Sequence, residues 1–294
     1  MKNFFITIDS TCDYPADFAP EAFDRIPVEY VLDGKTHADG FKSEDDAKAF
    51  YAAVRDGKMP TTSLIPPERF TDFVRPILMA GNDVLHVTLS SGLSGTYNCA
   101  KMAAEELQKE FPQRKIMVLD SLSATVGSAL LVDKLLEYRE NHTITETYEY
   151  GLIIRRKLNL YFTVDSLKHL HRGGRVSRLT AIVGQIMMIK PVLHVNDEGK
   201  LIAIGKVMSR GMSIKWLANK VASRIDTNLT DYVYICHGDC IKDAETLAQM
   251  IEAKTGKKSR IEYTGAVIGS HSGPGTLAVF FFGKNRAEGK EQAD

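Results

Sequence analysis

Residues 85–100 read LHVTLSSGLSGTYNCA, an alternating apolar run that breaks into small hydroxyl residues and two glycines before a helical pattern resumes. This pattern predicts a strand, a glycine-containing turn and a helix. Where such a junction follows a parallel strand, free backbone N–H groups and the positive end of the helix dipole point into one crevice. We therefore expect an anion site, in which Ser91 and Ser94 add hydroxyl donors and Gly92 allows close approach to the backbone.

Two other interpretations of this junction remain open. In the first, Ser94 or Thr96 merely caps the helix. In the second, a serine acts as a nucleophile. The second is the weaker one, because the elbow of an α/β-hydrolase requires G-x-S-x-G and residues 92–96 read GLSGT.

Strand-length apolar runs alternate with helical patterns along the first half of the chain. The predicted strands are residues 4–8, 84–89 and 116–119, and the predicted helices are residues 44–54, 68–79, 97–111 and 124–138. This alternation is typical of an α/β fold in which helices cover a largely parallel sheet. We therefore predict an N-terminal parallel-sheet, Rossmann-like domain.

The second half of the chain predicts a smaller, mixed α/β domain. Residues 143–158 read as one more helix, in which Thr143 is the N-cap and Glu146 completes a capping box. We place the domain boundary at the end of that helix, so that the predicted domains are residues 1–158 and 159–294. The charged tail after Lys284 is expected to fray.

The elements expected in the second domain are short. Helices are expected from Ser166 onward and at residues 243–255, and strands at residues 161–164, 192–195, 201–204, 233–236, 261–263 and 277–282. The strands at 192–195 and 201–204 flank a glycine-containing turn, which is typical of a hairpin.

The composition of the 294-residue chain disfavours several classes of function. It contains 37 Lys and Arg and 37 Asp and Glu, so no net positive field attracts nucleic acid. The apolar run at residues 181–189 is too short to span a membrane. The segment MKNFFITIDS contains no signal-peptide cleavage site, and four cysteines are too few for a disulfide framework. We therefore expect a cytoplasmic protein with reduced thiols.

Two more segments carry polar groups that suit a ligand site. Thr61, Thr62 and Ser63 precede a helix that starts with proline, a position where hydroxyl groups usually act as caps. His271 lies in residues 265–274, which are rich in glycine and serine, and we expect a tight turn between two strands there.

A basic cluster and a cysteine pair complete the candidates. The segment HLHRGGRVSRL contains Arg172, Arg175 and Arg178, which form either a solvated helix end or a dock for an acidic or phosphorylated partner. The segment CHGDC, residues 236–240, lacks the second ligand pair that a zinc site needs. We predict no metal there and interpret it as a strand end with buried thiols.

Seven segments follow one another along almost the whole chain. They are IDSTCDYP near the start, PTTS at residues 60–63, LSSGLSGTY at 89–97, LDSLSATVG at 119–127, LKHLHRGGRVS at 167–177, IKPVLHVNDEGKL at 189–201 and GAVIGSHSGPG at 265–275. Together they resemble the DegV family, also known as the fatty acid binding subunits of bacterial fatty acid kinase. Each segment alone is a weak signal, whereas seven in the same order are specific.

The resemblance implies a two-domain α/β protein that encloses one long-chain fatty acid, such as palmitate, stearate or oleate, at the domain interface. The acyl tail would occupy an apolar tunnel. The implied ligands of the carboxylate are Thr62 or Ser63, Ser91 with the Gly92 backbone N–H, and His271.

The resemblance also implies a partner. The protein would not itself be an enzyme and would need no cofactor or metal. It would present the acid to a separate ATP-dependent fatty acid kinase, which forms an acyl phosphate. Arg172 and Arg175 are the implied candidates for kinase docking or phosphate stabilisation.

One position departs from the family pattern. Many relatives follow the Thr-Ser pair with Gln-Pro, whereas Ser63 is followed here by Leu64 and Ile65. We therefore expect a drier, more apolar wall beside the head group.

Two functions of other classes stay open. One is a phosphatase or esterase that acts on a small anion with Ser91 or Ser94 and His271. The other is a transcription factor or adaptor that senses lipid, which the neutral charge balance and the lack of a recognisable DNA-reading helix disfavour.

Overall fold

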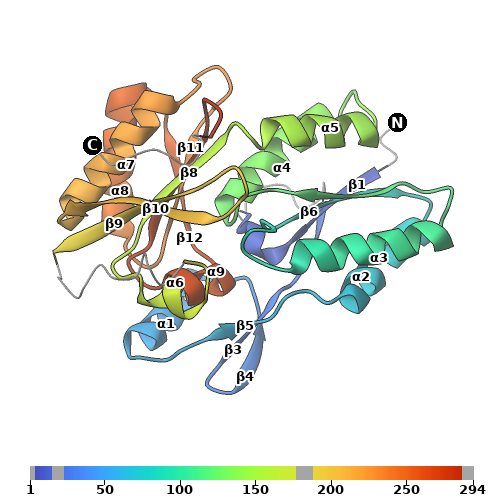
Figure 1. Ribbon diagram of the computed structural model, residues 1–294, viewed down its shortest axis with the longest axis horizontal. Helices are drawn as coiled ribbons and strands as arrows, with labels where there is room; N and C mark the ends of the chain where they lie inside the picture. Colours follow the sequence, from blue (N-terminus) through green and yellow to red (C-terminus); the bar gives the residue numbers. More distant parts are fainter. Residues whose placement is uncertain (1–3, 15–22, 177–187, 287–294) are drawn as a thin grey trace.

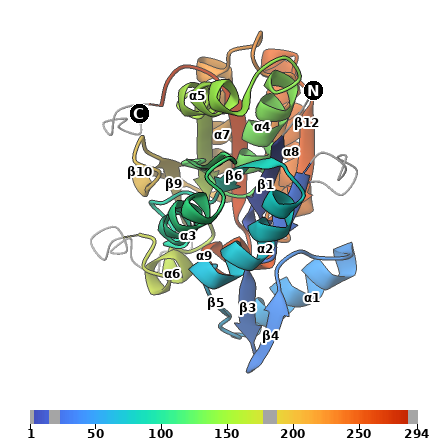
Figure 2. The same cartoon turned by 90° about the vertical axis from the view of Figure 1, so that its right-hand side faces the viewer.

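The computed structural model describes residues 4–14, 23–176 and 188–286, and its strands form two main sheets that lie side by side (Figure 1). A smaller third sheet projects from one end of the molecule (Figure 2). Within these described residues, no helix combines the length and apolar character needed to cross a membrane.

The first main sheet is parallel, as predicted. Its order is β2-β1-β6-β7, formed by β1 (Phe4–Asp9), β2 (Phe23–Ile26), β6 (Asp83–Thr88) and β7 (Ile116–Asp120). Helices α2 (Pro67–Met79) and α3 (Thr96–Glu110) pack on one face, and α4 (Val126–Tyr138) and α5 (Ile144–Ile154) pack on the other (Figure 1). This is the Rossmann-like arrangement that the alternating pattern predicts.

The second main sheet is mixed and has the order β10-β9-β8-β13-β11-β12. Its strands are β8 (Leu158–Thr163), β9 (Ile189–Val195), β10 (Leu201–Met208), β11 (Val233–His237), β12 (Ser259–Tyr263) and β13 (Leu277–Phe282). Only the β11–β12 pair is parallel. Helices α7 (Arg210–Arg224) and α8 (Ile241–Thr255) cover its outer face (Figure 1).

Helix α4 joins the two main sheets into one core. Eight of its 13 residues are buried, and it contacts strands of both sheets. A helix that is apolar on most of its circumference must be covered on all sides. The largest apolar cluster accordingly runs from Ile6 and Leu85 in the parallel sheet, through Leu131, to Phe162 and Phe280 in the mixed sheet.

The third sheet and the helix that lies between its strands in sequence belong to the first half of the chain but pack against the second half. The sheet has the order β4-β3-β5 and consists of β3 (Glu29–Leu32), β4 (Lys35–Ala38) and β5 (Thr61–Thr62). Helix α1 (Glu44–Arg55), capped by Ser43, lies between these strands in sequence. Its buried Phe50 and Tyr51 pack against Ala266 of α9 (Ala266–Ser272).

Most of the predicted elements are confirmed, but some boundaries are wrong. The helix predicted at residues 143–158 has the expected capping box of Thr143 and Glu146, yet it ends at Ile154. Leu158 instead begins β8, whose six residues are all buried in the interior of the mixed sheet. The sequence interpretation also missed α7 and the strands β2, β3 and β4.

Two local predictions about candidate residues are wrong. Thr61 and Thr62 do not cap a helix, because they form β5 and pair with β3. His271 does not lie in a turn, because residues 266–272 form α9. The described part of the tail does not fray: Arg286 is buried and donates hydrogen bonds to the carbonyls of Leu158 and Leu122.

Some predictions concern residues that the structure does not describe. They are most of the apolar run at 181–189, Arg178, and the tail at residues 287–294.

Gly127→Ala tests the close packing of α4 against the mixed sheet. An added Cβ at this position collides with the Phe280 ring and the Ser123 hydroxyl. We expect the free energy of unfolding in chemical denaturation to fall by about 1–3 kcal/mol, the usual cost of overpacking. Gly211→Ala in α7 is the matched control, since a Cβ there meets no atom within 4 Å. An equal loss in both variants would contradict this account of α4.

Candidate functional site

An apolar cavity of about 240 Å³ lies between the two main sheets. Its wall combines residues of both halves of the chain, of which the apolar ones include Leu89, Leu160, Phe162, Val267, Ala278 and Phe280. A single water needs only about 10–15 Å³ on this measure. The cavity therefore suits a larger, mostly apolar ligand.

One end of the cavity is polar. There the Thr62 hydroxyl lies 2.8 Å from His271 Nε2, and Ser63, Ser94 and Arg175 also line the wall. Thr62 comes from β5 and His271 from α9, two elements separated by 209 residues. Ser63 and Leu64 are exposed while they line the cavity, so this polar end reaches the surface.

The position of His271 depends on its helix and on a glycine. The first turn of α9 is held by two carboxylates: Asp13 accepts from the Gly265 N–H at 3.0 Å, and Asp39 accepts from the Val267 N–H at 3.1 Å. On its other side the His271 ring approaches Gly173 so closely that a Cβ there would collide with Nδ1. Only a glycine at position 173 of the RGGR segment leaves room for the His271 ring in this position.

The charge around His271 is positive. Burial, followed by the nearby Arg175 and Arg172, lowers the pKa of His271 to about 4. The imidazole is therefore neutral at pH 7. Arg175 donates from Nε to the Leu93 carbonyl at 3.1 Å. Arg172 is the last residue of α6 (Lys168–Arg172) and donates to the carbonyls of Pro60 and Ser270. An anion at this end of the cavity would meet the Arg175 guanidinium group and a neutral imidazole, because Arg172 does not line the cavity.

The loop between β6 and α3 places its serines differently. Ser94 lines the cavity and accepts from the Thr96 N–H at 3.2 Å. The N-cap of α3 is Gly95, which has no side-chain cap hydrogen bond, so the interpretation that Ser94 or Thr96 merely caps the helix is wrong. Ser91 is exposed, and its backbone N–H donates to Asp120. The Gly92 N–H donates to Ser90 Oγ, and a Cβ on Gly92 would lie 2.6 Å from the backbone of Gly199. Neither Ser91 nor Gly92 is among the residues that line the cavity.

The same contacts bear on the hydrolase alternative. His271 Nε2 pairs with Thr62, and the Ser94 hydroxyl pairs with Thr96 at 3.0 Å. A general base needs a hydrogen bond to its nucleophile. The described geometry therefore favours binding over catalysis at this site.

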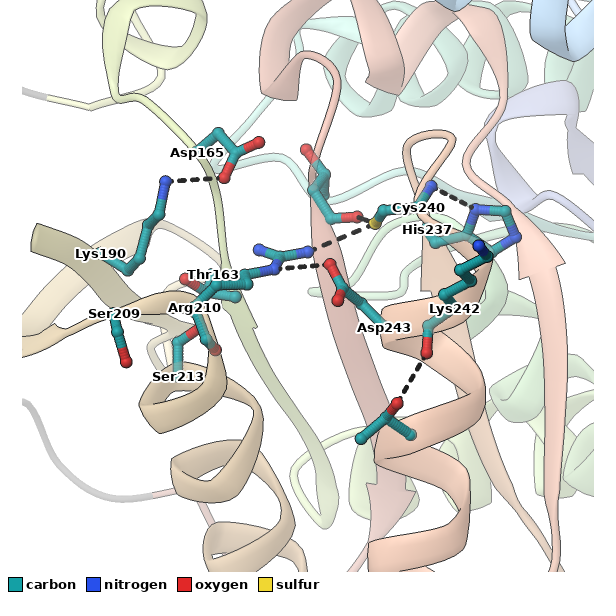
Figure 3. A network of polar contacts seen from close by, with 12 residues as sticks. Thr163, Asp165, Lys190, Ser209, Arg210, Ser213, His237, Cys240, Lys242 and Asp243 are labelled. Carbon is teal, nitrogen blue, oxygen red and sulfur yellow. Dashed lines mark hydrogen bonds and ion pairs between the residues drawn. The ribbon is translucent and has the colours of Figure 1, made fainter. Parts of the chain in front are cut away.

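The CHGDC segment has structural contacts of its own (Figure 3). The Cys240 N–H donates to His237 Nδ1 at 3.2 Å, and Cys240 Sγ lies 3.3 Å from Arg210 Nη2. Burial raises the pKa of the Cys236 and Cys240 thiols to about 12. Among the described residues, no group of three or more His, Cys, Asp or Glu is arranged to hold a metal ion.

Sequence reasoning missed five hydroxyl residues of the wall, which are Thr11, Thr125, Thr276, Thr264 and Ser272. The last two are buried, and Ser272 follows His271 directly in α9. The only signal in the sequence was their place in the glycine-rich segment around His271. Leu64, the departure from the family pattern, lines the cavity and is 42% exposed, whereas Ile65 is buried away from it.

An α/β fold with an apolar cavity between two sheets, lined at its surface end by hydroxyl, imidazole and guanidinium groups, defines a class of small-ligand binding proteins. The chain belongs to the DegV family: the model of that family, described as "Uncharacterised protein, DegV family COG1307", matches residues 3–284. The resemblance stated from the sequence is thus confirmed.

Individual proteins that are similar to this chain also belong to the DegV family. A DegV domain-containing protein of Clostridium perfringens is 39% identical over 97% of this chain and 99% of its own length. A DegV lipid binding protein of Thermotoga maritima has a TM-score of 0.81 at 28% identity and covers 97% of this chain and 100% of its own. A DegV family protein of Thermus thermophilus, whose structure is described as showing fatty acid binding, has a TM-score of 0.83 at 26% identity, covering 96% and 99%.

The environment of His271 is testable by NMR titration. We expect its ring to titrate near pH 4, well below the ordinary 6.5, because burial and the two arginines oppose the charged form. Arg175→Met should raise this midpoint, since it removes a nearby positive charge. Arg75→Met, an exposed residue of α2 paired with Glu110, is the control and should leave the midpoint in place. A His271 midpoint near 6.5 in the unaltered protein would contradict the described site.

Proposed function

We propose that this protein binds one long-chain fatty acid, with the tail in the apolar cavity between the two halves of the chain and the carboxylate at the Thr62–His271 end. The observation that carries the proposal is a mostly apolar cavity whose wall, beside the exposed Ser63 and Leu64, also includes the paired Thr62 and His271 and the Arg175 guanidinium. The lipid and fatty acid binding attributed to the relatives from Thermotoga maritima and Thermus thermophilus supports it.

The energetics of such a ligand favour tight binding. Burying a chain of about sixteen carbons at roughly 0.8 kcal/mol per methylene contributes on the order of 12 kcal/mol. Association and ordering of the chain oppose this by several kcal/mol. Two or three charge-assisted hydrogen bonds of about 1.5–3 kcal/mol each mainly offset desolvation of the carboxylate. The tail therefore sets the affinity, and the polar end sets the orientation.

We assign the carboxylate to Thr62, Ser63, Ser94 and His271, which line one end of the cavity together. We propose that Ser91 and Gly92 do not contact the carboxylate but stabilise the loop that carries Ser94. The Ser91 N–H donates to the Asp120 carboxylate, and the Gly92 N–H donates to Ser90 Oγ. For these two residues the proposed role thus changes from direct ligand to support of the ligand loop.

We further propose that the protein presents its acid to a separate ATP-dependent kinase in the cytoplasm and is not itself the enzyme. The carboxylate end adjoins the exposed Ser63 and Leu64, so a partner can reach it without extracting the tail. Arg175 lines the cavity, and Arg172 contacts the segment just before β5. We assign both guanidinium groups to kinase docking or to stabilisation of the transferred phosphoryl group.

Native mass spectrometry tests the binding itself. We expect the purified protein to carry one fatty acid, or to take one up on incubation. Ala278→Phe, which places a ring in the cavity wall, should lower occupancy at least tenfold, because it occupies the volume of the tail. Ala52→Phe on the exposed side of α1 is the control and should retain the ligand. A protein that takes up no acyl chain would refute the proposed function.

Acyl phosphate formation with the cognate kinase tests the head-group assignment. His271→Ala should lower the rate at least tenfold while palmitate binding changes less, because orientation depends on the polar end and affinity on the tail. His142→Ala changes a histidine that stacks on Tyr138 and does not line the cavity, so this variant should keep the full rate. If His271→Ala keeps the full rate as well, His271 does not orient the carboxylate.

A further inference from the structure

Arg286 is a buried cation at the end of the described chain, with only 5% of its surface exposed. Burial lowers the pKa of its guanidinium group to about 10, so the group remains charged at pH 7. Within residues 4–14, 23–176 and 188–286 it forms no ion pair. It donates instead to four backbone carbonyls, which are those of Leu122, Leu158, Asn196 and Arg155, at 2.6, 2.7, 3.2 and 3.3 Å. Arg286 therefore joins the loop after β7, the junction of α5 and β8, and the turn between β9 and β10.

The loop after β7 supports the ligand loop, which we define as residues 89–95. Arg286 holds the Leu122 carbonyl of the supporting loop, and the Leu122 N–H donates to the Asp120 carboxylate at 3.0 Å. The same carboxylate accepts from the Ser91 N–H of the ligand loop at 3.1 Å. The supporting loop and the ligand loop are thus joined through one carboxyl group.

The supporting loop has a strained backbone. Leu122 has a φ of 51°, in the left-handed region that a leucine disfavours. Such a conformation persists only where the surrounding contacts fix it. Asp120 fixes the N–H of this residue, and Arg286 fixes its carbonyl. The next carbonyl, that of Ser123, accepts from the Ser90 N–H at 2.9 Å, so relaxation of the strained residue would disturb the ligand loop directly.

The turn between β9 and β10 supports the ligand loop from the second half of the chain. The Asn196 carbonyl accepts both from Arg286 and from the Gly199 N–H, the latter at 2.9 Å. The Gly199 carbonyl accepts from Ser90 Oγ at 2.8 Å, and a Cβ on this glycine would lie 2.0 Å from the same oxygen. The turn and the ligand loop are therefore in direct contact, and Arg286 fixes the turn.

Ser90 connects both supports to the cavity wall. It is fully buried, and its carbonyl accepts from the N–H groups of Leu93 and Ser94 at 3.0 and 3.1 Å. Ser94 lines the cavity, whereas Ser90 does not. A displacement of Ser90 therefore moves a hydroxyl group that we assign to the carboxylate.

We propose that Arg286 is a positioning residue for the carboxylate end of the ligand, and that it acts through Ser90 on Ser94. This inference rests on the proposed function and deepens it. Arg286 does not line the cavity, so its effect on the ligand is indirect. The planar guanidinium group presents five N–H donors in fixed directions and can hold several carbonyls at once, whereas a lysine ammonium group is a single point charge with three donors.

A competition between two ligands of equal tail length isolates the head group. Protein stripped of lipid is incubated with equimolar palmitate and hexadecanol, and the bound compounds are extracted and quantified by mass spectrometry. Arg286→Lys should lower the ratio of bound palmitate to bound hexadecanol about tenfold, the value of roughly one charge-assisted hydrogen bond. Arg286→Gln, which keeps two donors without the charge, should lower the ratio in the same direction.

Two further variants separate positioning from a general loss of stability. Leu247→Ala truncates a buried residue of α8 in the apolar cluster on the outer face of the mixed sheet, so it should destabilise the fold and keep the ratio. Ser90→Ala should lower the ratio as Arg286→Lys does, because it removes the bond to the turn. The double variant should lose less than the product of the two separate losses, since both act through one set of contacts.

The outcomes separate this inference from the function on which it rests. If the ratio is unchanged in Arg286→Lys, or if Leu247→Ala lowers it equally, Arg286 does not position the head group, and fatty acid binding stands. An unchanged ratio in Ser90→Ala also refutes the inference, even where the Arg286 variants do not fold. Losses that multiply fully in the double variant would show that Arg286 does not act through Ser90. If the unaltered protein binds no palmitate, the proposed function itself fails.

Discussion

The placement of α9 by two inward-facing carboxylates, Asp13 and Asp39, is the constraint on which the site depends. Each accepts a hydrogen bond from a backbone N–H at the start of the helix, and both come from the first half of the chain. Burial raises the pKa of Asp39 to about 6 and that of Asp13 as well. Burying two carboxyl groups costs folding free energy, and in return their hydrogen bonds fix the position of one short helix. That helix carries His271, Ser272 and the wall residue Val267.

The periodicity of the sequence predicted the parallel sheet and most helices, because those elements bury one face or one stripe locally. It failed where the burial comes from distant segments. The glycines around His271 suggested a turn, yet a Cβ on Gly269 would lie against the Tyr51 hydroxyl, so this glycine serves the packing of α1 against α9. No local pattern reveals a partner more than two hundred residues away.

The candidate site was predictable to a similar degree. Family motifs identified Thr62, Ser63 and His271, and the structure brings all three to one end of the cavity. The motif LSSGLSGTY could not distinguish Ser91 from Ser94, because that choice depends on the Asp120 carboxylate and the hairpin turn at Gly199. Thr264 was not foreseen at all, since nothing in its local sequence indicates that it lines the cavity.

Helix α4 constrains how this architecture can change in evolution. Its sequence is too apolar to face solvent, and it is covered by β6 on one side and by β8, β11 and β13 on the other. Exchange of either half with a foreign domain would leave that helix uncovered, and the ligand wall would lose one of its sides. The two halves must therefore be inherited together, and variation in ligand preference has to arise from single side chains rather than from recombination.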